Sequence, residues 1–134
     1  MGRLIDTSIL IESERGRLDL NNFVTDRGNE GFFISVVTVS ELLHGVHRAI
    51  DPHTKAKREA NVESMLQEFV ILDIDLVTAR IHSKLWADLE SAGETIGQND
   101  FWLAATCVAK GLVMVTANIK HFRRIPGLEV EIWQ

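Results

Sequence analysis

The chain has 134 residues, of which 46% are hydrophobic and 25% are charged, and its formal net charge is −5. This length and composition predict one globular domain with a substantial core and exclude an extended disordered chain. The single cysteine, Cys107, excludes an intrachain disulfide and indicates a small core residue in a reducing, cytoplasmic setting. No apolar run approaches the roughly 20 residues that cross a bilayer, and the N-terminus lacks the apolar stretch of a signal peptide, so we expect no membrane association.

Short apolar runs and glycine or proline breaks divide the chain into alternating strands and helices. The expected elements, in chain order, are a strand at 3–5, helices at 7–15 and 18–26, a strand at 32–37, helices from 38 to the Asp51-Pro52 break and over 54–68, a strand at 69–72, a helix from 75 to Gly93, a turn at 96–99, a helix from 100 to Gly111, a strand at 112–115, a helical turn at 118–122 and a strand at 128–132. The last strand alternates apolar and acidic residues, which is typical of an edge strand with one solvent-facing side. This order predicts an α/β domain with a mostly parallel sheet, formed by residues 1–134 as one unit.

The net charge argues against a general nucleic-acid-binding protein, which is usually basic. It does not exclude a metal-dependent enzyme, because clustered carboxylates add negative charge that bound cations cancel. The basic residues also occur in groups, so a local positive patch can still hold phosphates. One group is Lys55, Lys57 and Arg58, for which solvated surface charge is an equal explanation, and the other is Lys120, His121, Arg123 and Arg124.

Three acidic residues and one amide lie where strands pass into helices. Asp6 follows the first strand, Glu41 lies in the first helical turn after the second strand, Asp100 begins the helix before the fourth strand, and Asn118 comes shortly after that strand. Each acid alone has a structural explanation, since helix N-termini favour carboxylates. Asp6 and Asn99 have the position of helix caps, and Glu41 completes a capping box with a threonine three residues earlier.

Taken together, the acids indicate a metal site. In an open parallel sheet the carboxyl ends of the strands share one edge, and ligands bind in the crevice there. Three carboxylates held close repel each other, and desolvation raises their pKa values, whereas a divalent cation relieves both penalties. Oxygen ligands favour Mg²⁺ or Mn²⁺ over zinc. We therefore expect a Mg²⁺ or Mn²⁺ site at this edge.

A zinc site built from histidines is the competing arrangement. His44 and His47 are three residues apart on one expected helix, with His53 nearby, but there is no HExxH pattern and no clear third ligand. We interpret these three mainly as surface or groove residues. His82 and His121 are isolated in the sequence.

Four segments resemble a known family. They are Leu4-Ile5-Asp6-Thr7-Ser8; Thr38-Val39-Ser40-Glu41-Leu42 with Gly45; Ile96-Gly97-Gln98-Asn99-Asp100 with Leu103-Ala104-Ala105; and Val115-Thr116-Ala117-Asn118 with His121-Phe122 and Ile125-Pro126-Gly127. In this order and spacing they resemble the PIN domain, and specifically the VapC group of toxins. The similarity runs from Leu4 to Trp133, nearly the whole chain.

The resemblance implies a three-layer α/β/α fold with a short parallel sheet. It also implies an acidic pocket that uses Mg²⁺ or Mn²⁺ to hydrolyse single-stranded or loop RNA. The family's first, second and third acids fall on Asp6, Glu41 and Asp100. Asn118 falls on a position that often carries aspartate, so the fourth carboxylate is absent here, which weakens the case for a permanently occupied second metal site. The hydroxyl positions that steady such a pocket fall on Thr7, Ser8 and Thr116.

The expected mechanism assigns roles to these residues. Asp6 and Asp100 hold the first metal directly, and Glu41 ligates it through water or orients the attacking water. Asn118, which cannot act as a base, hydrogen-bonds a metal-bound water or the phosphate. Candidates for contacts with the RNA backbone are Lys120, Arg123 and Arg124.

The resemblance also implies partners. Proteins of the VapC group form homodimers and are blocked by a VapB-like antitoxin peptide that lies in a groove near the pocket. Apolar helix faces around Leu42, Leu43 and Val46, and around Trp86, suggest such contact surfaces. Transfer RNA is the substrate that the resemblance favours, with messenger RNA and ribosomal RNA as the alternatives.

Other families fit less well. A phosphatase of the haloacid dehalogenase type requires Asp-x-Asp after its first strand, and Ser8 occupies the second position here. A receiver domain requires paired acids after its first strand, and these are missing. The alternative from another functional class is a PIN-like domain that binds RNA or a partner without cutting; the missing fourth acid permits it, and the three retained acids argue against it.

Overall fold

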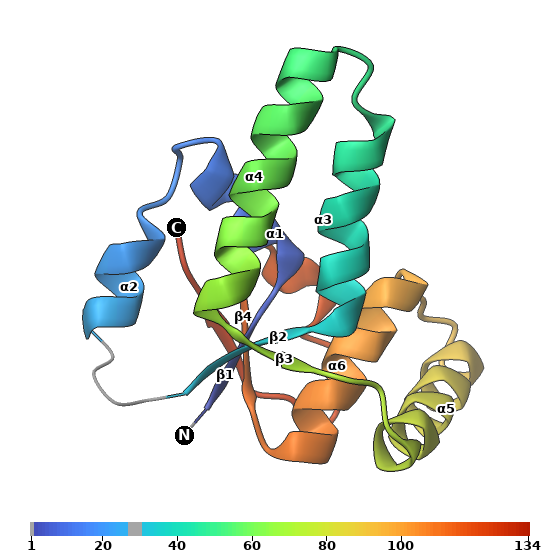
Figure 1. Ribbon diagram of the computed structural model, residues 1–134. Helices are drawn as coiled ribbons and strands as arrows, with labels where there is room; N and C mark the ends of the chain where they lie inside the picture. The colour runs from blue at the N-terminus through green and yellow to red at the C-terminus, as the bar shows by residue number, and fades with distance from the viewer. Residues whose placement is uncertain (1, 27–30) are drawn as a thin grey trace.

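The computed structural model describes residues 2–26 and 31–134 (Figure 1). Its elements are β1 (Arg3–Ile5), α1 (Thr7–Glu14), α2 (Leu20–Asp26), β2 (Phe32–Ser35), α3 (Val36–Arg48), α4 (Pro52–Glu68), β3 (Val70–Leu72), α5 (Leu76–Ser91), α6 (Gln98–Lys110), β4 (Val113–Thr116), the 3-10 turn η1 (Ile119–His121) and β5 (Val130–Ile132). The strands form one five-stranded sheet in the order β3-β2-β1-β4-β5. The predicted α/β fold is confirmed.

Every strand pair in the sheet is parallel, and β1 lies at its centre. Leu4 in β1 is in register with Phe33 of β2 on one side and Met114 of β4 on the other. The carboxyl ends of β1, β2 and β4 therefore lie side by side at one edge. Asp6, the start of α3 and Asn118 all follow those ends, as the sequence predicts.

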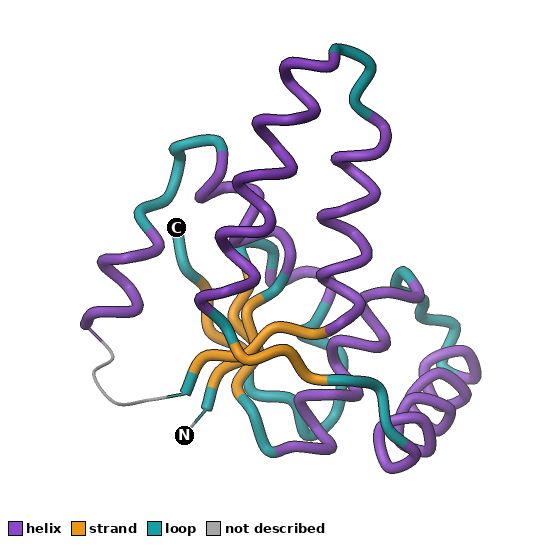
Figure 2. The backbone as a smooth tube through the Cα atoms, in the orientation of Figure 1, coloured by secondary structure: helices purple, strands orange, loops and turns teal. Residues whose placement is uncertain are grey.

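Helices cover both faces of the sheet, which makes three layers (Figure 2). One core cluster joins β1 and β4 to α5 and α6, with Leu85 and Leu103 among its buried members. The other joins the sheet to α1, α2, α3 and α4, with Ile9 and Val62 among its members. Cys107 is buried in the first cluster, as expected of a core residue. No helix in the described ranges has the length and apolar character needed to cross a membrane.

The second cluster also takes up Leu42 and Val46, which are 6% and 1% exposed. The sequence suggested that this helix face serves more than the core, but most of its apolar area is already buried within the chain. Trp86 on α5 is different, because 44% of it is exposed.

The interface between α5 and α6 contains an aromatic cluster, formed by His82, Trp86, Phe101 and Trp102. The His82 ring stacks on Trp102, with centroids 3.6 Å apart and planes 16° apart. Phe101 meets the same ring edge-on at 6.0 Å. Burial lowers the pKa of His82, and a side-chain hydrogen bond with Gln98 partly opposes this. The neutral ring therefore packs as an aromatic core residue.

The start of α3 differs from the prediction. The β-branched run predicted a strand as far as Val37, followed by a capping box between Thr38 and Glu41. Instead β2 ends at Ser35, whose hydroxyl accepts a hydrogen bond from the Val37 N–H at 3.0 Å and so caps the helix. A serine that satisfies a free N–H group outweighs the strand preference of two valines. Thr38 is freed from capping and is completely buried.

Other boundaries shift for similar reasons. Helix α4 begins at Pro52, because Asp51 caps it through the Thr54 N–H at 3.0 Å and proline suits a first helical position. Helix α6 begins at Gln98 with Gly97 as its cap residue, so the cap expected at Asn99 is wrong. The edge position of β5 is confirmed.

The expected alternation along β5 fails at its end. Ile132 is 41% exposed, whereas Glu131 is partly buried and pairs with Arg3 Nε at 3.0 Å. Two residues after Glu131, the buried Trp133 stacks on Phe23 of α2 with ring centroids 4.7 Å apart. An ion pair and an aromatic anchor therefore decide which side chains face inward here.

Candidate active site

Asp6 lies directly after β1, at the N-cap position of α1. Its backbone N–H donates to the Val115 carbonyl at 2.8 Å, which fixes it beside the end of β4. Its side chain does not cap α1, contrary to the structural interpretation of this acid. Oδ2 accepts hydrogen bonds from the Ser8 hydroxyl at 2.8 Å and the Thr116 hydroxyl at 2.7 Å. Asp6 is 6% exposed, so two hydroxyls hold an otherwise costly buried carboxylate.

The hydroxyl-bearing residues predicted to steady the pocket do link its strand ends. The Thr7 hydroxyl donates to Glu41 Oε1 at 2.7 Å and lies 3.0 Å from the Thr38 hydroxyl. Ser8 Oγ accepts from the Ala117 N–H at 3.1 Å. Thr116 Oγ1 accepts from the N–H two residues later at 3.0 Å. These bonds join the ends of β1 and β4 to α3.

Asp100 lies in the first turn of α6 and is partly buried. Its Oδ2 is 2.9 Å from His121 Nδ1. Burial raises the pKa of Asp100 most, the negative charge of Asp6 raises it next, and Glu41 raises it further, while His121 lowers it. Asp6 and Glu41 therefore both act electrostatically on Asp100, although α6 and β1 are far apart in the sequence.

Asn118 caps the turn η1, and its Oδ1 accepts from the Lys120 N–H at 3.3 Å. Its Nδ2 lies 3.3 Å from His121 Nε2. An amide nitrogen can only donate, so Nε2 accepts and the ring proton lies on Nδ1, facing Asp100. Asn118, His121 and Asp100 thus form a short hydrogen-bonded chain. The sequence left His121 isolated, because its partner is 21 positions away and only the basic cluster around it was visible.

The remaining predicted residues lie close by in the chain. Lys120 and Arg123 are exposed in and after η1. Arg124 Nε lies 3.8 Å from Glu94 Oε1, and both side chains are substantially exposed. All three are therefore near Asn118 in the sequence, but Arg124 already pairs with Glu94.

The donor set suits a hard divalent cation. Carboxylate, hydroxyl and amide oxygens are the ligands that Mg²⁺ and Mn²⁺ prefer, and a cation relieves the repulsion that raises the pKa of Asp100. Within residues 2–26 and 31–134, however, no three His, Cys, Asp or Glu side chains already form a group placed to hold a metal. Each acid instead has its own partner, namely hydroxyls for Asp6, Thr7 for Glu41 and His121 for Asp100.

A model of the PIN domain family matches residues 3–128. The chain belongs to the PIN-domain family. Among curated relatives of this PIN domain, Ribonuclease VapC1 of Rickettsia felis is 35% identical over 130 residues, which is 97% of this chain and 95% of that protein. The tRNA(fMet)-specific endonuclease VapC of Salmonella typhimurium is 33% identical over 100 residues, covering 75% of this chain and 74% of that protein.

Solved structures agree with the family assignment. A chain of VapBC2 from Rickettsia felis, solved bound to a DNA fragment from their promoter, superposes on this PIN domain with a TM-score of 0.91 at 29% identity and complete coverage of both chains. A chain of DNA-bound VapBC from Salmonella typhimurium superposes with a TM-score of 0.89 at 27% identity, again with complete coverage of both. The resemblance to the PIN domain and to its VapC group, expected from four short segments, is confirmed.

Proposed function

We propose that this PIN domain is a divalent-metal-dependent endoribonuclease and the toxin half of a toxin–antitoxin pair in the cytoplasm. The observation that carries the proposal is the arrangement of Asp6, Glu41 and Asp100 around the carboxyl ends of β1, β2 and β4. Their mutual influence on the pKa of Asp100 means that they share one electrostatic environment. The names of its relatives, ribonucleases of the VapC type, support the same activity.

Mg²⁺ or Mn²⁺ would be held by Asp6 and Asp100, with Glu41 acting through water. When bound, such an ion lowers the pKa of an attacking water and stabilises charge on the phosphate. The protein's contribution is orientation. Ser8 and Thr116 hold Asp6 through Oδ2, and Thr7 fixes one oxygen of Glu41. Partners that orient ligating carboxylates in this way commonly account for about 10–100-fold in affinity or activity.

His121 adds a role that the sequence did not suggest. Its Nδ1–H holds Asp100 Oδ2, and Asn118 keeps the ring in that tautomer. Asn118 therefore serves the site through His121, which differs from the expected contact between Asn118 and a metal-bound water or phosphate. Lys120, Arg123 and Arg124 stay candidates for RNA contacts.

The substrate we propose is transfer RNA. Relatives from Salmonella typhimurium and Shigella flexneri, 33% and 30% identical to this chain, are named tRNA(fMet)-specific endonucleases. The partner we propose is a VapB-like antitoxin, because solved structures similar to this chain are VapBC complexes, and we expect the toxin itself to form a homodimer. A flexible single strand or loop can bend its phosphate into a pocket at a sheet edge, which a stiff duplex cannot do easily.

A PIN domain that binds RNA or a partner without cutting is the alternative. Two observations favour it. Asn118 stands where a fourth carboxylate would add a ligand, and the acids in the described residues are engaged by partners of their own. The three retained acids and their mutual effect on Asp100 favour the enzyme.

The test is cleavage by purified, antitoxin-free protein. Total RNA and defined transfer RNAs are incubated with Mg²⁺ or Mn²⁺ and, in parallel, with EDTA. Discrete cleavage that requires the metal is expected to fall by at least about 100-fold in Asp6→Asn, since loss of a mere supporting partner already costs about 10–100-fold. Asp88→Asn, an exposed acid on α5, is the matched control and should retain full activity. Folded protein that cuts no RNA at high concentration would establish the non-cutting alternative.

A further inference from the structure

A cleft of about 590 Å³ opens between α1, α3 and α4. It lies next to the candidate site of Asp6, Glu41 and Asp100, here called the carboxylate pocket. Glu41 belongs to both, because it lines the cleft and also accepts the hydrogen bond from Thr7. His44 and Arg48 line the cleft further along α3. Steps of three and four residues keep these side chains on one helix face. The cleft therefore starts at a carboxylate of the candidate active site and continues along α3 for about 10 Å, at 1.5 Å per residue.

Each helix that borders the cleft supplies or adjoins one arginine. Arg15 follows α1, Arg48 ends α3 and Arg58 lies in α4. All three are exposed, and within the described parts of the chain none of them makes an ion pair. Two acids, Glu14 and Glu41, also line the cleft, so its cations outnumber its anions. Arginines that converge on one cleft from different elements without acidic partners provide donors for phosphate oxygens.

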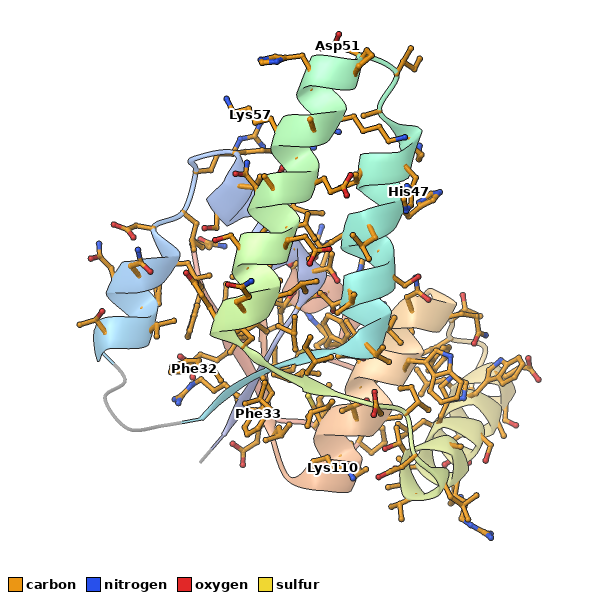
Figure 3. The ribbon with its side chains drawn as sticks, in the orientation of Figure 1. Phe32, Phe33, His47, Asp51, Lys57 and Lys110 are labelled. Carbon is orange, nitrogen blue, oxygen red and sulfur yellow. The ribbon has the colours of Figure 1, made fainter. Side chains whose placement is uncertain are left out.

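The positive charge continues onto the hairpin of α3 and α4, which projects beyond the sheet (Figure 1). Residues 44–58 contain four lysines and arginines, three histidines and a single acid, Asp51. This segment has a formal charge of +3 with neutral histidines, in a chain whose total is −5. His47 and Lys57 point outward from the two helices (Figure 3). A local excess of this sign on an acidic protein attracts a polyanion to one place.

Gly45 lies in the middle of α3 and lines the cleft. A Cβ added there would meet no atom within 4 Å, and its φ is not positive, so neither packing nor backbone geometry requires glycine. Glycine inside a helix costs about 1 kcal/mol relative to alanine. The absence of a side chain at Gly45 leaves space on the cleft surface of α3, which lets another backbone approach the helix closely.

We propose that the cleft of α1, α3 and α4 binds the sugar-phosphate backbone of the RNA strand next to the cleavage site. Arg15, Arg48 and Arg58 contact its phosphates, and Gly45 leaves room for them. This inference rests on the proposed ribonuclease function and adds the path of the substrate. A strand whose phosphate is cut at Asp6 and Asp100 must continue over the neighbouring surface. The cleft joins that site through Glu41 and carries the positive charge a strand requires.

The test measures binding without cleavage. A short fluorescein-labelled single-stranded RNA of mixed sequence is titrated with the protein in EDTA, and its anisotropy is followed at several salt concentrations. The triple variant Arg15→Ala, Arg48→Ala and Arg58→Ala is expected to bind about tenfold or more weakly, with the slope of log K against log salt reduced by about 2, which is about 0.7 for each lost phosphate contact. Arg80→Ala, an exposed arginine on α5, is the matched control and should bind as the unchanged protein does.

A second variant tests the cleft by filling its space and leaves its charge unchanged. Gly45→Met introduces a good helix former whose side chain occupies the space beside Gly45. RNA binding should therefore weaken, while the free energy of unfolding does not fall. Gly45→Ala should be more stable, with RNA binding close to that of the unchanged protein. Unaltered RNA affinity and salt dependence in both the triple variant and Gly45→Met would overturn the inference and assign the cleft to a protein partner. RNA that binds through these residues but is never cut would overturn the proposed ribonuclease activity and would still support RNA binding in the cleft.

Discussion

The carboxylate pocket and the aromatic cluster meet on α6 but have opposite energetic characters. Asp100 lies in the first turn of the helix, and Phe101 and Trp102 follow it immediately. In the pocket, burial and two neighbouring acids raise the pKa of Asp100. In the cluster, neutral rings stack on His82, whose pKa burial lowers. The first region concentrates charge that the fold alone does not neutralise, whereas the second buries apolar surface.

The difference suggests that two neighbouring parts of α6 have different roles, one in the candidate site and one in stability. Residues that repel one another do not hold their own positions, so an adjacent, tightly packed element must hold them. The aromatic cluster fixes α6 against α5, and α6 in turn holds Asp100 beside the ends of the strands. Substitutions in the cluster should therefore act mainly on stability, and substitutions in the pocket mainly on activity.

The largest effect is expected from Phe101→Ala. Phe101 is 2% exposed and packs against His82, so its removal should lower the free energy of unfolding by about 3–5 kcal/mol. Urea denaturation followed by circular dichroism measures the change. Trp86→Ala, which truncates a ring that is 44% exposed, should cost clearly less. A Phe101→Ala variant as stable as the unchanged protein would mean that the cluster does not anchor the helix.

The next effect concerns activity. Thr116→Val keeps the shape of the side chain but removes the hydrogen bond to Asp6 Oδ2, and RNA cleavage should fall by about 10–100-fold. The cleavage rate under saturating metal is the measurement, with folding checked by thermal denaturation. Thr106→Val is the control, because that buried hydroxyl bonds the Trp102 carbonyl within α6 instead of a pocket acid. Loss of cleavage in both variants would show a general structural effect.

The smallest effect is a gain in stability that depends on pH. The pKa of Asp100 is raised above 3.8, so the folded state binds its proton more tightly than the unfolded state. The ionised Asp100 therefore lowers the free energy of unfolding. This loss is absent below pH 3.8, grows as the pH rises through the folded-state pKa and is complete above it. Asp100→Asn should therefore be more stable than the unchanged protein at neutral pH in EDTA, with the advantage shrinking in acid. Urea midpoints across pH test this; an advantage that does not shrink in acid would contradict it.

Much of the fold was visible in the sequence, because it depends on local patterns. Apolar runs at 3–5 and 112–115 predicted strands, and glycine stops predicted helix ends such as the left-handed Gly111. The start of α3 was predicted two residues late, since Ser35 caps the helix within a β-branched run. Capping chemistry and strand preference compete there, and the sequence does not show which one prevails.

The sequence named the residues of the candidate site but did not show how they are connected. Asp6 follows β1, Glu41 lies in the helix after β2, and Asp100 lies in the first turn of α6, which precedes β4. Their positions relative to the expected strands suggested that they gather. The pairing of Asp100 with His121 could not be inferred, because it depends on where the fold places η1 relative to the start of α6. The cleft was also hidden, because its lining comes from three helices that are separate in the sequence.

The hydrogen bond between Thr116 and Asp6 spans 110 positions, and β4, which brings Thr116 to the pocket, pairs directly with β1. During synthesis on a ribosome, β1 emerges first with one side of it unpaired until β4 has been added. A nascent chain that stops short of β4 contains Asp6 without the Thr116 hydroxyl that orients its carboxylate. For the proposed ribonuclease, this sheet order delays completion of the site until nearly all of the chain has left the ribosome that makes it.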